Sequence, residues 1–519
     1  MSILSTQVLV IGGGATGLGI AWDAALRGLK VVLVEQQDLA QGTSGRYHGL
    51  LHSGGRYVIS DPQSAVDCAR ENEILRQIAA HTIEDTGGFF IATPADPLDY
   101  PDKWFAACRE LNVSTNEIDL STLREREPLL NPRISRAFEV RDASLDSFDL
   151  SHALSKSIIE AGGQVLLRHR VMNLLQNQGR VFGAEILDQT SGETIHLEAE
   201  ITVNATGPWA DEIASLANVH VPINLGKGTM VAMASRVVNT VINRLKPPSD
   251  GDIAVPIGTV CVLGTTDIPV DTPWSLEIEP WEIDLLLAEG DFMIPGLRSA
   301  RALRAWAGIR PLYSPEDSPS ETRALTRAHA LLDHKEIDGV EGFVSMIGGK
   351  LTTFRLMAQE TVDMVCDKLE QDLECVTRTT SLLSDADQIM YTLPDRLNRF
   401  AAARQNSGDE RLICECEIVT DKQLQAAINS VDFETLDDLR RDLRLGMGPC
   451  QAAFCAYRAA GLSCRLRPDS ISENFLGRFL DERWKGLRPL AWGKDLRQMD
   501  FMRRVYLELL GELPEKGSA

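Results

Sequence analysis

The chain has 519 residues, 44% of them hydrophobic, and a formal net charge of -22 from 52 basic and 74 acidic residues. At roughly 100–200 residues per domain, this length predicts two or three domains. The negative charge argues against nucleic acid as a partner, because phosphate contacts require clustered Lys and Arg. It does not exclude an anionic small molecule, because a few buried Arg residues reverse the local field.

Neither a membrane span nor a leader peptide is visible. No apolar run approaches the roughly 18 residues of a spanning helix, and the first strand candidate, at 7–11, leaves no room for a leader. We therefore expect a cytoplasmic protein, either soluble or held at a membrane by a partner. Six of the ten cysteines are scattered, as reduced cytosolic thiols are: Cys68, Cys108, Cys261, Cys366, Cys375 and Cys464.

The N-terminal segment alternates between strand and helix patterns. Residues 7–11 (Q-V-L-V-I) form a short apolar run, which is followed by glycines and then by a stretch with helical apolar spacing. A second apolar run, at 30–34, ends at Glu35. This order predicts a strand–turn–helix–strand unit within a parallel sheet.

The glycines of this unit form a dinucleotide-binding motif. Gly12, Gly14 and Gly17 occupy the positions of G-x-G-x-x-G directly after the first strand. The first permits a tight turn, the second lets a pyrophosphate approach the backbone, and the third lets the helix pack on the strand. The pyrophosphate then lies at a helix N-terminus. Glu35, about 20 residues on, is placed to accept the ribose hydroxyls.

Later apolar runs predict further strands, at 200–205, 252–256, 259–264 and 343–347. The second and third of these suggest an antiparallel region. The last precedes G-G-K-L-T-T-F-R, which predicts a turn into a helix that begins near Leu351–Thr353. The nucleotide-binding domain is therefore expected to be discontinuous, with substrate-domain segments inserted.

Two segments favour FAD over NAD as the nucleotide. Residues 42–57 (G-T-S-G-R-Y-H-G-L-L-H-S-G-G-R-Y) are rich in small and polar side chains, which suits a loop that wraps an extended cofactor. Residues 204–211 (N-A-T-G-P-W-A-D) place a Thr-Gly turn after a strand, as FAD enzymes do.

With these segments, the sequence resembles the D-amino-acid-oxidase type of flavoprotein and, within it, the FAD-dependent glycerol-3-phosphate dehydrogenases. The resemblance rests on I-G-G-G-A-T-G-L-G-I-A at 11–21, L-H-S-G-G-R-Y at 51–57, N-A-T-G-P-W at 204–209, K-G-T at 227–229, G-T-T-D at 264–267, A-G-I-R-P-L at 307–312, L-T-R at 325–327 and G-G-K-L-T-T-F-R at 348–355. These segments follow the family's order over about the first 370 residues.

The resemblance implies a fold of the α/β and α+β class. We expect a Rossmann-like FAD-binding domain with an inserted antiparallel-sheet substrate domain over 1–375, then a small helical cysteine-rich module and a helical tail. Their expected ranges are 1–80, 140–225 and 300–375 for the FAD-binding part, 81–139 and 226–299 for the substrate part, 376–410 for a linker, 411–465 for the module and 466–519 for a tail available for partner docking.

The resemblance also implies a substrate site. Arg310 is expected near the substrate oxygen, and the phosphate is expected to contact Arg56, Tyr57, Arg327 and Lys350. Arg suits this task because its planar fork donates bidentate hydrogen bonds to phosphate. His52 is a candidate proton acceptor, or alternatively a side chain that packs on the flavin. Aerobic relatives carry a histidine after K-G, where this sequence has K-G-T-M, and Met230 cannot accept a proton.

The resemblance also implies the residues that hold FAD. The helix that begins near residue 351 would direct its N-terminus at the flavin and favour negative charge there. The residues implied are Gly12, Gly14, Ala15, Thr16, Gly17, Glu35, Thr43, Ser44, His48, Leu50, Val171, Ala205, Thr206, Gly207, Gly349, Lys350, Leu351, Thr352 and Thr353.

Four further cysteines form two close pairs near the end of the chain. Cys414 and Cys416 read C-x-C, and after 33 residues Cys450 and Cys455 read G-P-C-Q-A-A-F-C. Two such pairs suit a metal centre. Zinc is one reading, although C-x-C is tighter than the usual C-x2-C, and unmetallated thiols are another. The segment resembles a bacterioferritin-associated-ferredoxin-like module, which implies a [2Fe–2S] cluster.

Flavin domain, cysteine module and the tail W-K-G-L-R-P-L-A-W-G together resemble the A subunits of anaerobic, three-subunit bacterial glycerol-3-phosphate dehydrogenases. This resemblance implies that glycerol 3-phosphate is oxidised to dihydroxyacetone phosphate. Electrons would leave through the cluster to a flavin-containing B subunit, then to an iron–sulfur, membrane-anchoring C subunit, and finally to menaquinone. The protein would then be peripheral on the inner face of the membrane. Another polyol phosphate, an oxidase reaction, or a cluster-binding scaffold are the alternatives.

Overall fold

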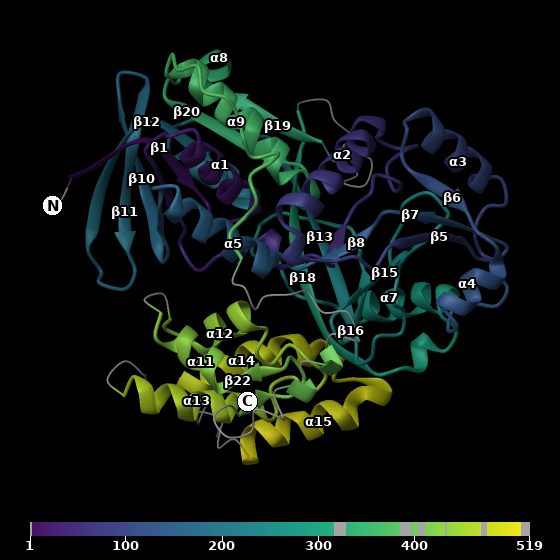
Figure 1. Ribbon diagram of the computed structural model, residues 1–519. Coiled ribbons are helices and arrows are strands. Elements are labelled where there is room, and N and C mark those ends of the chain that lie inside the picture. Colours follow the sequence, from purple (N-terminus) through teal and green to yellow (C-terminus); the bar gives the residue numbers. More distant parts are fainter. Residues whose placement is uncertain are drawn as a thin grey trace.

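The computed structural model describes residues 3–315, 328–384, 396–398, 400–402, 411–430, 433–468 and 475–509. Two large sheets form the upper part of the molecule, and a helical module lies beneath both of them (Figure 1). Among the described residues, no helix combines the length and the apolar character needed to cross a bilayer.

The first sheet has eight strands and is built on the predicted N-terminal unit. Five strands run parallel in the order β9 (Gln164–Leu166), β2 (Val31–Val34), β1 (Ile3–Ile11), β12 (Thr194–Asn204) and β20 (Phe343–Gly348). Three antiparallel strands extend it, namely β10 (His169–Asn177), β11 (Arg180–Asp188) and β19 (His329–Asp333).

Both faces of this sheet are buried, which explains its continuous apolar runs. Val8 and Val10 of β1 face helices, while Leu9 and Ile11 face the opposite core, because successive side chains of a strand alternate. The helices on the first face are α1 (Ala15–Leu26), α5 (Ser147–Glu160) and α9 (Phe354–Lys368). On the other face lies α6 (Ala210–Ser215).

The second sheet has nine strands and is antiparallel except between β14 and β5. Its strands are β17 (Ile268–Val270), β13 (Ile223–Met233), β16 (Val260–Gly264), β15 (Ile253–Ile257), β14 (Val241–Arg244), β5 (Gly88–Ala92), β7 (Arg136–Val140), β6 (Thr115–Glu117) and β18 (Ala302–Tyr313). Helices α2 (Pro62–Ile78), α3 (Tyr100–Glu110), α4 (Leu120–Arg126) and α7 (Pro280–Met293) accompany it.

The fold class expected from the sequence is confirmed, with one difference in detail. The sequence places residues 300–375 in the FAD-binding part, but β18 pairs with β13 from Ile223↔Tyr313 to Met233↔Ala302 and so belongs to the second sheet. The alternation of side chains along β18 indicates a strand but does not reveal which sheet the strand joins. A small third sheet, β3 (Leu50–Leu51), β8 (Ala143–Leu145) and β4 (Ile83–Glu84), joins the two parts.

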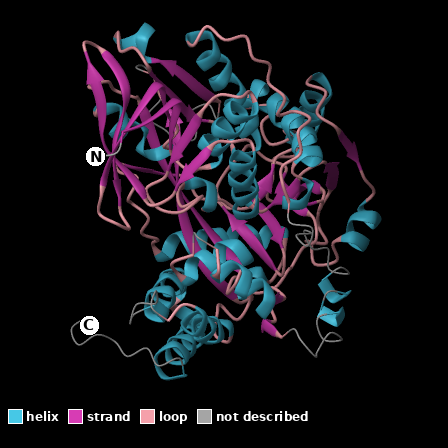
Figure 2. Ribbon diagram, turned by 60° about the vertical axis from the view of Figure 1, so that its left-hand side comes forward, coloured by secondary structure: helices cyan, strands magenta, loops and turns pink. Residues whose placement is uncertain are grey.

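The C-terminal module is mainly helical (Figure 2). A two-stranded ladder, β21 (Leu412–Cys414) and β22 (Val419–Thr420), precedes α11 (Asp421–Ile428), α12 (Leu436–Leu443), α13 (Cys455–Leu466), α14 (Phe475–Leu487) and α15 (Leu496–Arg504). Thr420 and Thr435 start α11 and α12 with capping boxes, in which the threonine hydroxyl and the side chain three residues later satisfy free amides reciprocally.

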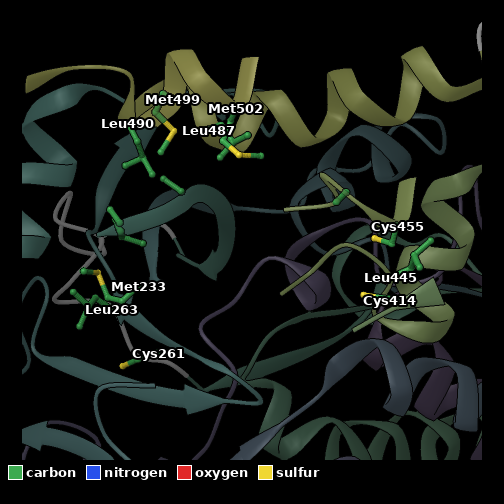
Figure 3. Close-up of a cluster of buried hydrophobic side chains, with 14 of the residues drawn as sticks. Met233, Cys261, Leu263, Cys414, Leu445, Cys455, Leu487, Leu490, Met499 and Met502 are labelled. Atoms are coloured by element: carbon green, nitrogen blue, oxygen red, sulfur yellow. The ribbon is translucent and has the colours of Figure 1, made fainter. Parts of the chain in front are cut away.

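The tail helices share one apolar core with the module and with the second sheet. Figure 3 shows Leu487 and Leu490, which flank the end of α14, with Met499 and Met502 of α15 on one side. Met233 and Leu263 of the second sheet, and Cys414, Leu445 and Cys455 of the module, belong to the same buried cluster. The tail therefore joins the module to the second sheet.

Buried ion pairs fasten α12 and the residues beside it to the FAD-binding part. Arg441 pairs with Asp38, three residues beyond Glu35. Arg444 pairs with Asp146, whose side chain is 2% exposed. Because breaking a buried pair leaves an uncompensated charge, these contacts fix the position of the module relative to the FAD-binding part.

Candidate active site and cysteine centre

A cavity of about 1230 Å³ lies between the two sheets. Its walls include residues at the C-terminal ends of β1, β2, β12 and β20, together with residues of β13 and β18. Open α/β sheets bind ligands in the crevice outside the carboxyl ends of their strands. The volume exceeds the roughly 300–1,000 Å³ of most small-molecule pockets, as an extended cofactor plus a substrate requires.

Most of the residues expected at the cofactor and the substrate line this one cavity. Those on its wall are Gly12, Gly14, Ala15, Thr16, Glu35, Thr43, Ser44, His48, Leu50, His52, Arg56, Tyr57, Val171, Ala205, Thr206, Gly207, Arg310, Gly349, Lys350, Leu351 and Thr352. Gly17 and Thr353 do not line it. Arg327 lies outside the described residues.

The glycine turn is shaped by close backbone contacts. Gly12 has φ +114°, and a Cβ there would lie 2.7 Å from the carbonyl oxygen of Ala205. A Cβ at Gly17 would lie 2.0 Å from the oxygen of Gly12. Gly17 therefore acts through the packing of α1 on β1, as predicted for the third glycine, and does not need to line the cavity.

The N-terminus of α1 is arranged for an anion. Gly14 occupies the cap position and supplies no side chain to it, and Ser44 Oγ accepts the N–H of Ala15 at 2.9 Å. Helix N-termini bind phosphate because their first N–H groups lack intrahelical partners. Glu35 lies beside this turn and accepts the N–H of Gly13 at 2.7 Å. Burial raises the pKa of Glu35.

Two buried polar atoms on the cavity wall lack a hydrogen-bond partner among the described residues: Trp209 Nε1 and Ser249 Oγ. A buried donor without a partner is unfavourable. Both atoms therefore favour a polar ligand in the cavity. Together with the glycine turn, the open helix terminus and Glu35, they fit FAD and a polar substrate.

Arg310 lies on β18 with its guanidinium held at the cavity wall. Its Nη1 donates to the oxygen of Thr266 at 3.2 Å and to Asp267 at 3.1 Å, and its Nη2 donates to Thr265 Oγ1. A Cβ at Gly228 would lie 2.4 Å from Nη2, so glycine at this position leaves room for the guanidinium. The side chain is 25% exposed.

A second cationic group lines the same cavity. Arg56 Nη2 donates to Asp252 at 2.8 Å, and the side chain of Asp252 is fully buried. Lys350 Nζ lies 4.5 Å from the ring centroid of Tyr57 and donates to Ser64 Oγ at 2.7 Å. Residues from the loop after β3 and from the turn after β20 are thereby brought together.

His48 and His52 lie between these cations. Their ring centroids are 6.0 Å apart, and that of His52 lies 5.2 Å from that of Tyr57. Burial, then the charges of Arg56 and Arg310, lowers the pKa of His48 to about 3. The pKa of His52 lies well below 6.5, chiefly because the ring is buried and further because of electrostatic interactions with His48, Arg56 and Lys350. Both imidazoles are therefore neutral at pH 7, and a neutral imidazole accepts a proton.

The lowered pKa of His48 predicts a pH-dependent stability. Between pH 3 and 6.5 the unfolded chain binds a proton on His48 that the folded chain does not, so the free energy of unfolding falls as the pH is lowered through this window. In His48→Asn this slope is expected to drop by about 1.4 kcal/mol per pH unit. Urea unfolding of both proteins at several pH values measures it, and equal slopes would contradict the assignment.

Several wall residues were missed by the sequence analysis. Ser249 lies in P-S-D-G-D, a run that reads as an ordinary turn. Its N–H donates at 2.8 Å to Oδ2 of Asp252, a fully buried side chain that does not itself line the cavity. Trp209 lies within the N-A-T-G-P-W segment, and its place in that segment was the one sequence feature that could have marked it as a wall residue. Ser249 carried no such signal.

The four cysteine sulfurs form a continuous chain of neighbours. Cys414 contacts Cys455, Cys455 contacts Cys450, and Cys450 contacts Cys416. Contact with Cys416 and then Cys455 lowers the pKa of Cys450 to about 2. Cys414 and Cys455 are buried, whereas Cys416 and Cys450 are partly exposed. All four are free thiols in the structure.

Backbone amides point at these sulfurs. The N–H groups of Gly446 and Glu417 donate to Cys414, and those of Ala452 and Phe454 donate to Cys450. A Cβ at Gly448 would lie 2.2 Å from the Cβ of Cys416, so glycine allows this close approach. Amide donors favour thiolate ligands. Within the described residues, no three or more His, Cys, Asp or Glu side chains surround a single ion position. A chain of neighbouring thiols fits the two metal positions of a [2Fe–2S] cluster.

Comparison with known proteins agrees with both sites. Residues 7–364 match the model of the FAD dependent oxidoreductase family, and residues 412–462 match that of the BFD-like [2Fe-2S] binding domain. These matches give the chain its two cofactors, FAD and a [2Fe–2S] cluster.

Similar proteins extend over nearly the whole chain. The A subunit of the anaerobic glycerol-3-phosphate dehydrogenase of Haemophilus influenzae is 40% identical over 98% of this chain and 94% of that protein. The A1 subunit of the corresponding Haloferax volcanii enzyme is 40% identical over 95% and 89%. In fold, the chain is similar to the glycerol-3-phosphate dehydrogenase of Bacillus halodurans complexed with FAD, with a TM-score of 0.65 and 22% identity over 94% and 97% of the two chains. The chain belongs to the FAD-dependent oxidoreductase family and, within it, to the family of anaerobic glycerol-3-phosphate dehydrogenase A subunits.

Proposed function

We propose that this chain oxidises the secondary alcohol of sn-glycerol 3-phosphate to dihydroxyacetone phosphate and passes the electrons outward through its cysteine centre. The observation that carries the proposal is a cavity that joins a dinucleotide-binding turn to Arg56, Lys350 and Arg310. They are three of the five Arg and Lys residues that line this cavity, and cations gathered there in a chain of charge -22 favour a dianionic ligand.

Arg56 and Lys350 bind the substrate phosphate in this proposal, with Tyr57 at their side. Asp252 orients Arg56 at 2.8 Å, and Ser64 orients Lys350 at 2.7 Å. The Ser249 hydroxyl, which has no hydrogen-bond partner among the described residues, donates a further hydrogen bond to the phosphate. Arg327, outside the described residues, is proposed as a further phosphate ligand from its L-T-R segment.

Arg310 binds the alcohol oxygen and stabilises the negative charge that grows there as its proton leaves. The acceptors Thr265, Thr266 and Asp267 fix the guanidinium before substrate arrives. Preorganised donors in a site that excludes water stabilise a developing charge far more than the same donors would in water.

His52 accepts the hydroxyl proton. In the free protein Arg56 and Lys350 help to hold its pKa below 6.5. A bound phosphate dianion offsets both charges, so the pKa of His52 rises when substrate binds, and the imidazole becomes a better base at the moment it is needed.

When bound, FAD supplies the two-electron acceptor for the hydrogen of the substrate carbon, and the cluster supplies a one-electron carrier. The turn and helix terminus of residues 12–17, with Ser44 and Glu35, hold the nucleotide. The turn at 349–352, which includes Lys350, also lines the cavity. Cys414, Cys416, Cys450 and Cys455 hold the cluster. We propose the ranges 1–375, 376–410, 411–465 and 466–519 as FAD-dependent domain, linker, cluster module and tail.

The electron acceptor beyond this chain is proposed to be a quinone. The relatives are named as A and A1 subunits, which implies partners for them. We propose that this chain assembles with a flavin-containing B subunit and with an iron–sulfur C subunit, located at the inner face of the membrane, and that these pass electrons to menaquinone. The chain would then be a cytoplasmic, peripheral component of that complex.

Anaerobic mixing of the purified protein with candidate substrates tests the reaction. We expect glycerol 3-phosphate to bleach the flavin absorbance, and glycerol, which lacks the phosphate, to fail at the same concentration. If an erythritol phosphate reduced the flavin and glycerol 3-phosphate did not, the erythritol phosphate would be the substrate instead. An oxidised flavin with every polyol phosphate would overturn the proposal.

Ser249→Ala is expected to weaken substrate binding. The variant loses one hydrogen bond to a charged phosphate, worth about 1.5–3 kcal/mol, or roughly 10- to 100-fold in KM, with kcat nearly unchanged. Steady-state kinetics with an artificial electron acceptor measures both constants. Ser191→Ala, an exposed serine in a turn outside the cavity, is the control. A wild-type KM in Ser249→Ala would remove this contact.

A further inference from the structure

Arg483 of α14 is a buried cation next to the cysteine centre. The residue is 1% exposed, and none of the ion pairs in the described part of the chain includes it. Its Nε has no hydrogen-bond partner there either. Burial, then the charge of Arg440, lowers its pKa only to about 10, so the guanidinium is charged at pH 7. A buried cation without a counter-anion is strongly unfavourable.

The guanidinium contacts both halves of the cysteine site. Its Nη2 donates to the oxygen of Gly446 at 2.7 Å and to Gln451 Oε1 at 2.7 Å. Gly446 in turn donates its N–H to the sulfur of Cys414. Gln451 directly follows Cys450. Arg483 is therefore linked to one cysteine of each pair through a single intervening residue: to Cys414 through Gly446, and to Cys450 through Gln451.

The loop that Arg483 contacts has an unusual backbone. Gln451 and Ala452 have φ +50° and +74°, in the left-handed region that residues other than glycine rarely adopt. Such a conformation persists where surrounding contacts fix it. Gln451 supplies these contacts: its Nε2 donates to the main-chain oxygens of Met447 and Gly448, and its main-chain oxygen accepts from the buried hydroxyl of Tyr506. In this backbone conformation the N–H of Ala452 points toward the sulfur of Cys450.

A second arginine adds to the positive charge. Arg304 of β18 packs against Gly486 of α14, where a Cβ would lie 2.5 Å from its Nη2. Arg440 is paired with Asp437 at 2.6 Å, whereas no ion pair in the described residues includes Arg304. The Arg and carboxylate groups that act on Arg483 are Arg304, Arg440 and Asp437, so cations outnumber carboxylates around it, as expected if an anion completes the site.

We propose that Arg483 is the positioning residue and the buried counter-charge of the [2Fe–2S] cluster, and that it raises the cluster's reduction potential. The cluster with four thiolates is an anion, and it gains one more negative charge when it accepts an electron. A nearby cation in a low-dielectric interior stabilises the reduced state more than the oxidised state. Electrons would then move more readily from the reduced flavin to the cluster. The inference deepens the proposed electron exit and does not depend on which polyol phosphate is oxidised.

The test is a redox titration of the cluster by its electron-spin signal in the full chain, without substrate. We expect R483M and R483Q to favour the oxidised cluster by at least tenfold relative to wild type, which for a one-electron couple is a decrease of 59 mV or more. R483K keeps the charge and is expected to stay close to wild type. R478M removes an exposed arginine from the same helix and should leave the potential unchanged.

The outcomes separate charge from shape. Unchanged potentials in R483M and R483Q, or an equal shift in R478M, would overturn the proposal. So would a potential retained by R483Q but lost by R483K, because a hydrogen bond and not the charge would then decide it. Iron content and thermal unfolding are measured alongside. Loss of iron in R483M and R483Q with retention in R483K supports the counter-charge, and loss in all three variants overturns it.

Discussion

Arg310→Ala is expected to lower the rate of flavin reduction by glycerol 3-phosphate by about 10³-fold or more while FAD stays bound. The reason is geometric. Arg310 is fixed by Thr265, Thr266 and Asp267 at the cavity wall, and it is the cation of β18 that faces the substrate end. Alanine removes the donor that stabilises negative charge on the alcohol oxygen, but it removes none of the residues that line the nucleotide end.

The measurement is stopped-flow flavin absorbance under anaerobic conditions, with the FAD content determined separately. Arg310→Lys keeps the charge but loses the planar fork, and it is expected to recover only part of the rate. Arg298→Ala, which removes an exposed arginine paired with Asp284, is the control and should behave as wild type. Normal reduction kinetics in Arg310→Ala would remove the residue from the mechanism.

Cys450→Ser is expected to have the opposite pattern. Flavin reduction by substrate should remain near the wild-type rate, whereas electron transfer to a quinone analogue should fall to background. Cys450 is one of the two inner members of the sulfur chain, in contact with both Cys416 and Cys455. Serine is a much poorer ligand of the cluster than the thiolate, because its hydroxyl does not ionise near neutral pH. The cavity of about 1230 Å³ has none of the four cysteines in its wall, so its chemistry is independent of them.

Cys464→Ser is the matched control, because Cys464 is an exposed cysteine on α13, the helix that begins at the ligand Cys455. Iron content, the electron-spin signal and quinone-analogue reduction are measured on both variants. Full acceptor activity in Cys450→Ser, with the iron lost, would place the cluster outside the electron route. Loss of activity in Cys464→Ser would point to a general defect of the module.

Local patterns bring the candidate residues of the nucleotide site together. Gly12, Gly14 and Glu35 lie within one strand–turn–helix–strand unit, so their spacing in sequence fixes their spacing in space. The same holds for the two cysteine pairs, which are close in the chain. Apolar spacing around residues 499–510 also predicts a helix there, in the region of α15.

What the sequence did not reveal depends on long-range packing. Ser249 reaches the cavity, and Asp252 reaches Arg56, 196 positions away in the chain, because β14 and β15 carry their loop there. No local pattern marks either residue for these contacts. The strand that carries Arg310 gives no sign that it pairs with β13. Arg483 looks like a surface residue of an amphipathic helix until the Cys450 loop is seen to fold against it.

The central claim is that one chain couples alcohol oxidation at the cavity to one-electron transfer at the cysteine centre. Anaerobic titration of the purified chain with glycerol 3-phosphate tests it most directly when flavin absorbance and the electron-spin signal of the reduced cluster are followed together. We predict that the flavin bleaches and that the cluster signal appears in the same titration. A flavin that stays oxidised, or a flavin that bleaches while an intact cluster with a potential accessible to it remains oxidised, would contradict the account.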